Sequence, residues 1–329
     1  MASQNEIARR AGVSQSVVSR VLNGRAAEFG IAAATVARVE AVAAEPGYRP
    51  DPAATMLLGR ASRLVGVVVR SFDDPFLAAI LQELNRGALA AGCTLLVTGL
   101  EDGGRADEVR QLQRYRPDAL IVVGTTEFSG WSDALFPAGR PVVQIGLPSG
   151  DPRIVTCGID EPAAAGALVA HLRARGHRRI GLLGDRTAAS RARLPLLSAA
   201  LAAGTDPLTP ALAWLDGAEG FEAGAAGAAP LLALPEAQRP TAVIATGDLI
   251  ALGLIRALSE RGCAIPATMA VAGYDDVPLA AWLRPALTTI RQPARGLAFA
   301  AMAIATGAAP RATLRLSGEL VVRESTGGD

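Results

Sequence analysis

The chain has 329 residues, and half of them are apolar, which is enough for two or three domains with a large buried core. Its formal net charge is only +1, which excludes a chain that is basic along its whole length. Residues 1–63 nevertheless hold eight Arg against five acidic residues, and this local excess of positive charge can attract DNA phosphates. All 32 basic residues are Arg, which we interpret as a bias of genome composition.

The three cysteines, Cys93, Cys157 and Cys263, lie far apart and lack the spacing of a zinc site. They are expected to be buried thiols in a reducing compartment, and no metal or other cofactor is expected. The polar N-terminus lacks the apolar stretch of a signal peptide, and no apolar run approaches the ~20 residues of a membrane span. We therefore expect a cytoplasmic protein that does not associate with a membrane.

The first part of the chain has a helical pattern. Gly12 permits a sharp turn, and Ser14 is a suitable N-cap for the helix that follows it. Valines at helical spacing predict a buried stripe on the third helix. The predicted helices are Asn5–Arg10, Gln15–Leu22 and Ala32–Ala44, followed by a short segment from Asp51 to Gly59.

After Arg63, short apolar runs rich in β-branched residues alternate with segments of helical length. Continuous apolar strands separated by helices are typical of parallel sheets covered on both faces. The pattern predicts a doubly wound α/β region with room for two lobes. The predicted strands are Leu64–Val69, Thr94–Thr98, Ala119–Val123, Pro141–Ile145, Arg179–Leu183, Ala242–Ala245 and Met269–Ala272. Residues 186–240 are rich in Ala, Gly and Pro and give no clear pattern.

Ala8, Gly12 and Val18 have the spacing of a helix-turn-helix. Ala8 lets two helices cross closely, Gly12 makes the turn, and Val18 packs the second helix onto the first. The outward face then carries hydrogen-bonding side chains suited to base edges and phosphates. On spacing alone, a plain three-helix cap remains the alternative. The outward residues are Gln15, Ser16, Ser19 and Arg20.

Several motifs in one order resemble the lactose/galactose repressor (LacI/GalR) family of transcription regulators. AGVSQSVVSRVLNG (11–24) is similar to the N-terminal signature of that family, and GYRPD (47–51) to the segment before its hinge. DPF (74–76), RGHRRIGLL (175–183), GDLIALG (247–253), AGYDDVPLA (272–280), PALTTIRQP (285–293) and LVVREST (320–326) follow in family order. Pro46 and Pro52 depart from the family pattern, and these departures concern the placement of the third helix and of the hinge.

The resemblance implies three parts: a helix-turn-helix domain over 1–48, a hinge over 49–62, and a two-lobed α/β domain like periplasmic binding proteins over 63–329. It implies a homodimer on double-stranded, near-palindromic operator DNA. Leu57 matches a leucine wedged into the minor groove, although ordinary helix packing is the alternative. The residues implied to contact DNA are Ser14, Gln15, Ser16, Ser19, Arg20, Asn23, Ala54 and Leu57.

The larger domain is implied to bind a small-molecule effector between its lobes, most simply a carbohydrate. Arg193 and Asp275 align with the family's ligand-binding arginine and carboxylate, which suit sugar hydroxyls. Phe76 could stack on a ring or pack in the core, and Gly247 stands where a polar ligand contact is often found. The effector residues expected are Phe72, Phe76, Arg193, Gly247, Asp275 and Gln292.

Three functions compete at this point. The first is a repressor controlled by a sugar. A variant of this function is the same DNA-binding regulator with a nucleobase or another non-sugar effector that acts as corepressor. The second is a transport-type binding protein that does not bind DNA, for which the helix-turn-helix would be unexplained. The third is a Rossmann-type enzyme, but Val69–Asp74 lacks the G-x-G-x-x-G turn and no catalytic set is evident. We therefore expect a regulator and not an enzyme.

Overall fold

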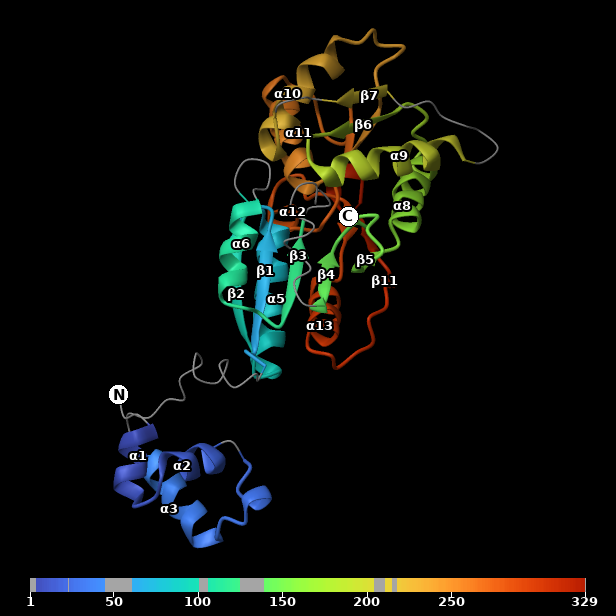
Figure 1. Ribbon diagram of the computed structural model, residues 1–329. Coiled ribbons are helices and arrows are strands. Elements are labelled where there is room, and N and C mark those ends of the chain that lie inside the picture. The colour runs from blue at the N-terminus through green and yellow to red at the C-terminus, as the bar shows by residue number, and fades with distance from the viewer. Residues whose placement is uncertain are drawn as a thin grey trace. The chain divides into compact units, whose positions relative to one another are not determined.

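The computed structural model describes residues 4–22, 24–44, 61–100, 106–124, 139–203, 211–214 and 218–328. The chain divides into two compact units, Met1–Ser62 and Arg63–Asp329 (Figure 1). Each unit has its own apolar core, and each is described by itself below.

The first unit is a small bundle of helices. Ile7, Ala8 and Ala11 of one helix pack against Val18 and Val21 of the next, because apolar residues three and four positions apart share a helix face. Gly12 has a φ of 64°, the left-handed conformation that its turn requires. The elements are α1 (Gln4–Ala11), α2 (Gln15–Leu22), the 3-10 turn η1 (Ala27–Phe29) and α3 (Ala33–Ala43).

The first lobe of the second unit contains a parallel sheet with the strand order β11-β5-β4-β3-β1-β2. Its central strand β3 is buried along its whole length, as expected for a strand covered on both faces. The strands are β1 (Leu64–Val69), β2 (Thr94–Gly99), β3 (Ala119–Val123), β4 (Val142–Ile145), β5 (Ile154–Ile159) and β11 (Leu314–Leu316).

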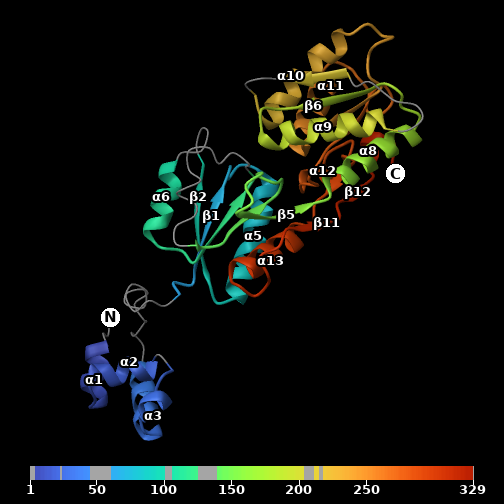
Figure 2. The ribbon, with the colours of Figure 1, turned by 45° about the vertical axis from the view of Figure 1, so that its right-hand side comes forward.

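Helices cover this sheet on both faces (Figure 2). On one face, α5 (Pro75–Ala90) and α13 (Ala294–Ala305) join the core that contains Val67 and Ile121. On the other face, Val109 and Leu112 of α6 (Ala106–Arg114) pack with Val68. The start of α5 is fixed locally, because the Asp74 side chain accepts the N–H groups of Phe76 and Leu77.

The second lobe repeats this plan around a parallel sheet with the order β7-β6-β8-β9. Neighbouring residues of β6 point to opposite faces: Leu182 joins the core under α8 and α9, and Leu183 joins the core under α10 and α11. The strands are β6 (Ile180–Gly184), β7 (Ala211–Trp214), β8 (Ala242–Ala245) and β9 (Ala270–Ala272). The helices are α8 (Glu161–Ala174), α9 (Ala188–Ala202), α10 (Gly220–Ala233), α11 (Asp248–Glu260) and the short α12 (Leu279–Trp282).

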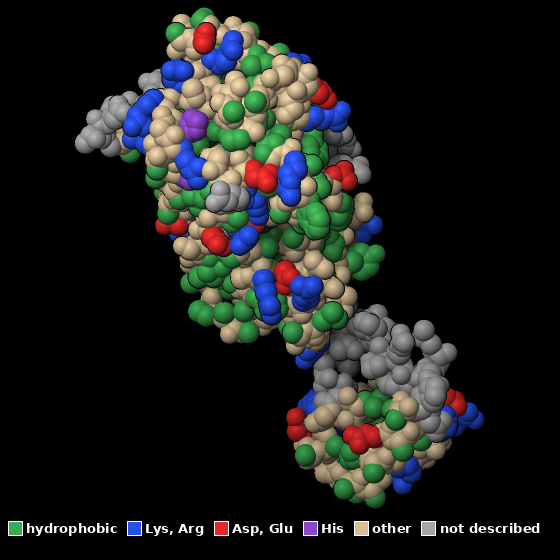
Figure 3. All heavy atoms as spheres, turned by 180° about the vertical axis from the view of Figure 1, so that it is seen from behind, with side chains coloured by type: hydrophobic (Ala, Val, Ile, Leu, Met, Phe, Trp, Pro, Cys, Tyr) green, Lys and Arg blue, Asp and Glu red, His purple; other side chains and the backbone are tan. Residues whose placement is uncertain are grey.

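The described chain passes between the two lobes at three places. The first crossing joins β5 to α8, and the second joins β10 (Thr289–Arg291) to α13. The third joins β11 to β12 (Glu319–Val321), which pairs antiparallel with β10 and leads to the 3-10 turn η3 (Glu324–Thr326). Side chains of both charge signs are interspersed on the face of this unit seen in Figure 3.

The predicted α/β fold class is confirmed, and β1, β3 and β8 have the predicted bounds. The strands β5, β7, β10, β11 and β12 were not predicted. Thr156 and Gly158 interrupt the apolar run of β5, and β10, β11 and β12 have three residues each, too few for a periodic signal. The valine stripe on α3 was partly wrong, because only Val39 is fully buried and Val36 and Val42 lie partly buried against it.

Candidate functional site

The outward face of α2 carries the polar residues predicted from the sequence. Gln15 and Ser16 are exposed, and Ser19 and Arg20 are half-buried, on the side opposite the buried Val18. The Ser14 hydroxyl accepts the backbone N–H of Val17 at 3.4 Å, which caps the helix as expected. This face can present hydrogen-bond donors and acceptors to a groove of DNA.

Two contacts hold this face in place. The guanidinium carbon of Arg20 lies 4.0 Å from the centre of the Phe29 ring, which follows α2. Arg38 of α3 donates from Nε to the carbonyl of Ala11 at 2.8 Å and so fixes α3 against the turn. Phe29 is 44% exposed, and its packing under Arg20 was not foreseen from the sequence. The predicted DNA contacts Asn23, Ala54 and Leu57 lie outside the described residues.

A cavity of about 500 Å³ lies between the two lobes of the second unit. The carboxyl ends of parallel strands from both lobes meet at this cavity, as is usual in open α/β sheets. Asp74 comes from the loop after β1, Asp185 from the end of β6, Thr246 from the end of β8, and Asp275 from the loop after β9. Acidic groups predominate in its lining, which includes Asp73, Asp74, Asp185, Glu219, Glu222, Asp248 and Asp275 beside Arg70 and Arg193.

Arg193 of α9 lies at the inner end of the cavity and is 6% exposed. Its Nη1 donates to the carbonyl of Thr246 at 2.8 Å and lies 3.3 Å from Oδ1 of Asp275. Its guanidinium carbon is 3.8 Å from the centre of the Tyr274 ring. Burial alone would lower the pKa of Arg193, but Glu161 and Asp275 hold it above its usual value, so the guanidinium stays charged.

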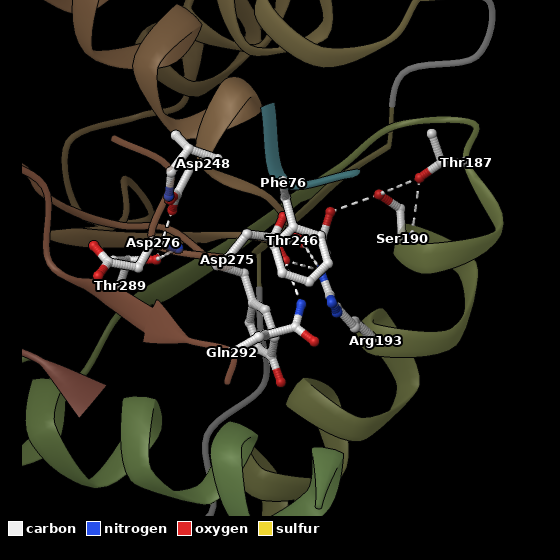
Figure 4. Close-up of polar contacts among 12 residues, drawn as sticks. Phe76, Thr187, Ser190, Arg193, Thr246, Asp248, Asp275, Asp276, Thr289 and Gln292 are labelled. Atoms are coloured by element: carbon white, nitrogen blue, oxygen red, sulfur yellow. Dashed lines mark hydrogen bonds and ion pairs between the residues drawn. The ribbon is translucent and has the colours of Figure 1, made fainter. Parts of the chain in front are cut away.

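Asp275 and Gln292, which were both predicted for the effector site, lie in contact with each other (Figure 4). Gln292 donates from Nε2 to Oδ1 of Asp275 at 2.6 Å, and Oδ2 faces the space over Gly247. Burial raises the pKa of the Asp275 carboxyl to about 7, although Arg193 opposes the shift. The φ of Asp275 is 114°, a strained value for a residue with a side chain.

A second polar cluster lines the wall formed by α9. The Ser190 hydroxyl lies 2.6 Å from the hydroxyl of Thr246 (Figure 4). It also donates to Oδ1 of Asp185 at 2.6 Å. Asp185 also accepts from the Thr187 hydroxyl at 2.6 Å and from the backbone N–H of Gly220 at 3.1 Å. These hydroxyls and carboxylates are oriented before any ligand arrives, which reduces the cost of ordering them on binding.

An ion-pair chain joins the two lobes at the cavity. Arg70 of the first lobe pairs with Asp74 at 2.7 Å and with Glu219 of the second lobe at 3.4 Å. Glu219 also pairs with Arg186 at 2.8 Å. Because these groups are partly exposed, their net contribution to stability is small, about 0–1 kcal/mol for each pair. Their position nevertheless lets them respond to a change in lobe spacing.

Neither of the phenylalanines predicted for this site is among the residues that line the cavity. Phe72 is 57% exposed, packs against Gly99 at the end of β2, and is not among the residues that line the cavity. Phe76 is partly buried and packs against two of the apolar clusters of the unit, in line with the alternative of core packing. Gly247 does line the cavity, with a φ of −158° that any residue can adopt.

Sequence reasoning missed Asp185, Ser190, Thr246, Asp248 and Glu161. Asp185 and Asp248 follow the apolar strands β6 and β8. The rule that open α/β sheets bind ligands at the carboxyl ends of their strands could therefore have identified both. Burial raises the pKa of Asp248 well above its usual value, and its carboxyl accepts from the Thr289 hydroxyl at 2.6 Å. No comparable signal marks Glu161, because its neighbours come together only in the folded chain.

Comparison with known proteins gives matches over the whole chain. The model of bacterial regulatory proteins of the lacI family matches residues 5–51, and that of the periplasmic binding protein-like domain matches residues 169–326. The HTH-type transcriptional repressor PurR of Photobacterium profundum is 30% identical over 336 residues, covering 99% of this chain and 98% of the relative. This chain belongs to the lacI family.

Other lacI-family matches agree with this assignment. The HTH-type transcriptional regulator MalR of Streptomyces coelicolor is 32% identical, covering 98% of this chain and 95% of the relative. The crystal structure of the lac repressor dimer bound to operator and the anti-inducer ONPF matches with a TM-score of 0.85 and 27% identity over 98% of each chain. A CelR–cellobiose complex matches with a TM-score of 0.69 and 26% identity over 99% of this chain and 100% of the other.

The predicted family is therefore confirmed, and this lacI-family chain is a DNA-binding transcription regulator. Its relatives are named as regulators and repressors, in line with a role other than catalysis. Among the described residues, no cluster of His, Cys, Asp and Glu is placed to hold a metal ion. The same residues include no helix that is long and apolar enough to span a membrane.

Proposed function

We propose that this chain is a repressor whose affinity for operator DNA is set by a small molecule bound between the lobes of its second unit. The observation that carries the proposal is the preformed cluster of Arg193, Asp275 and Gln292 at a cavity of about 500 Å³. A cavity of this size suits a mono- or disaccharide, and fixed polar groups at its wall provide orientation.

A sugar or sugar derivative is the effector that the lining favours. Asp74, Asp185 and Asp275 offer carboxylate acceptors for hydroxyl groups, and the CelR complex contains cellobiose. Phe221, which is 48% exposed in the lining, offers an aromatic face for stacking, the role considered for Phe76 from the sequence. A flat nucleobase stacked on Phe221 is the second candidate.

For the DNA side, we infer a reading head over residues 1–48 and a hinge over 49–62, with Ser14, Gln15, Ser16, Ser19, Arg20 and Asn23 in the major groove and Ala54 and Leu57 in the minor groove. Two copies are needed to occupy a near-palindromic site. An exposed apolar patch supports a dimer, since such patches often mark protein–protein contacts. It consists of Trp282, which is 82% exposed, and of Leu279 and Leu283, which are about half as exposed. The lac repressor structure is also of a dimer.

A thermal-shift screen of sugars, polyols, sugar acids and nucleobases tests the proposal, followed by anisotropy titrations of the hits against DNA selected by the wild-type chain. We expect a stabilising hit that changes DNA affinity. Arg193→Ala should abolish this response while DNA is still bound, and the control Arg256→Ala, at a side chain that is 82% exposed on α11, should respond like wild type. A hit that leaves DNA affinity unchanged would refute effector control.

A further inference from the structure

The turn formed by Asp275 and Asp276 has an unusual backbone. The φ angles are 114° for Asp275 and 55° for Asp276, so two consecutive residues with side chains adopt left-handed conformations. Such conformations are strained in a residue with a side chain and persist only where the surrounding structure holds them. The contacts of this turn explain what holds it.

Asp276 is tied to the second and third crossings between the lobes. Its Oδ2 accepts from Nε of Arg291 at 2.7 Å, and Arg291 is the last residue of β10. Its Oδ1 accepts from Nη2 of Arg323 at 2.6 Å, and Arg323 lies just beyond β12. Arg291 pairs in addition with Glu319, the first residue of β12, at 3.0 Å. The side chains of Arg323 and Asp276 are only 15% and 8% exposed, so this pair is well shielded from water, whereas Arg291 is 47% exposed.

Asp275 is tied to the first and second crossings. Gln292, which donates to Asp275, follows β10 directly. Arg193, which pairs with Asp275, also lies 3.4 Å from Oε2 of Glu161, the first residue of α8 after the first crossing. The same Glu161 oxygen accepts the hydroxyl of Tyr274 at 2.5 Å. Burial raises the pKa of Tyr274, so the phenol keeps the proton that it donates.

We infer that the Asp275–Asp276 turn couples the ligand cavity to all three described crossings, and that Asp276 is the positioning residue that carries the coupling to the third. A ligand that binds Asp275 on the cavity side competes for a carboxylate that the crossings also hold. Binding therefore changes the relative free energies of two lobe arrangements, as a ligand-driven switch requires. This inference rests on the proposed function for its ligand, but its contacts exist in the free protein.

The second acidic residue is required because a single carboxylate cannot reach all three crossings. Of the two, only Asp275 lines the cavity, and Arg323 is paired with Asp276. A disturbance at Asp275 thus reaches residues 319–323 through the turn and the two ion pairs of Asp276. Removing one member of a buried pair leaves the other charge uncompensated, so the links of Asp275 to Arg193 and of Asp276 to Arg323 are sensitive to substitution.

A double-mutant cycle in the full-length protein, read by hydrogen–deuterium exchange, tests the coupling without ligand or DNA. Asp275→Asn removes the cavity charge while keeping the size of the side chain. We expect it to speed exchange about tenfold at residues 159–164, 289–293 and 319–323. In the Asp276→Asn background, the effect of Asp275→Asn at 319–323 should disappear, while its effect at 159–164 should remain.

A merely structural role for Asp276 gives a different result. Asp276→Asn would then loosen residues 319–323 by itself, and the effect of Asp275→Asn would be added unchanged, which would overturn the coupling. If Asp276→Asn does not fold, Arg323→Gln breaks the same link from the other side and takes its place. Asp151→Asn, which removes an exposed ion pair with Arg153, is the control and should leave all three segments unchanged. Since no ligand or DNA is added, failure here is distinguishable from failure of the proposed function.

Discussion

The guanidinium of Arg20 stacks on the ring of Phe29, with 4.0 Å between the guanidinium carbon and the ring centre. The stack sets the direction of a side chain that is expected to reach DNA. Arg20→Ala should weaken specific binding by about 1–3 kcal/mol, the value of a good base contact. Phe29→Leu should cost less, about 0.5–1 kcal/mol, because it removes the ring that contacts Arg20 and Arg25 but leaves the Arg20 guanidinium in place.

Fluorescence anisotropy at one fixed salt concentration measures both effects, on selected DNA and on a scrambled duplex. Arg9→Ala is the matched control, because Arg9 pairs with Glu6 on the exposed side of α1. If Arg9→Ala and Arg20→Ala lose equal affinity on both duplexes, Arg20 contributes only general attraction to phosphates.

Leu57 is predicted to wedge between base pairs in the minor groove. Leu57→Ala should lower affinity for selected DNA more than for scrambled DNA, because only a specific complex forms and uses the kink. The same titrations measure this difference. Equal losses on the two duplexes would favour ordinary helix packing for Leu57.

Asp275 predicts a pH dependence of stability. Its folded pKa is raised to about 7, whereas an unfolded aspartate titrates near about 4, so between these values the folded chain holds a proton that the unfolded chain has released. Raising the pH through this window therefore lowers the free energy of unfolding. Compared with Asp275→Asn, wild type should lose urea resistance as pH rises from about 5 to about 8. A constant difference in midpoint would contradict the raised pKa.

Gly247 leaves space beside the cavity carboxylate. A Cβ built there would lie 3.7 Å from Oδ2 of Asp275, and the extended backbone accepts any residue. Gly247→Asn should fold normally and should alter which compounds stabilise the protein, since its amide can occupy the ligand's place at Asp275. Gly247→Ala is the smaller control. If both variants keep the wild-type ligand profile, the ligand does not approach this position.

Two helical glycines should respond oppositely to alanine. In α11, a Cβ on Gly253 would overlap the carbonyl oxygen of Phe221, a backbone atom that cannot rotate away. Gly253→Ala should therefore destabilise by at least about 2 kcal/mol. In α8, a Cβ on Gly166 meets nothing within 4 Å, so Gly166→Ala should stabilise by about 0.5–1 kcal/mol. Urea denaturation checks both signs.

The parts of this protein that the sequence predicted are those in which local pattern and tertiary packing agree. Leu64–Val69 and Ala119–Val123 carry no polar side chain, and the structure buries both as inner strands of the sheet, except for the partly buried Leu64. The turn at Gly12 and the buried Val18 follow from spacing alone. Arg193 and Asp275 were identified by resemblance, and the structure brings them to within 3.3 Å of each other.

The parts that could not be predicted depend on contacts between distant segments. Glu161 lies 113 positions from the Tyr274 hydroxyl that it accepts, and nothing near Glu161 in the sequence indicates that pairing. Phe72 was placed at the cavity because it follows a strand. Its ring instead packs on Gly99, where the missing side chain leaves room. That ligands bind at the carboxyl ends of parallel strands predicts which edge of the sheet carries the site, but it does not predict the direction of each side chain.

The order in which the chain crosses between its lobes also bears on how it is made. The sheet of the first lobe begins at Leu64 but is completed only by β11, which pairs with β5, and its core is closed by α13. A ribosome must therefore finish the second lobe before the first can close. Until then, the side of α5 that packs against α13 stays uncovered, and a nascent or prematurely terminated chain is a target for chaperones and proteases.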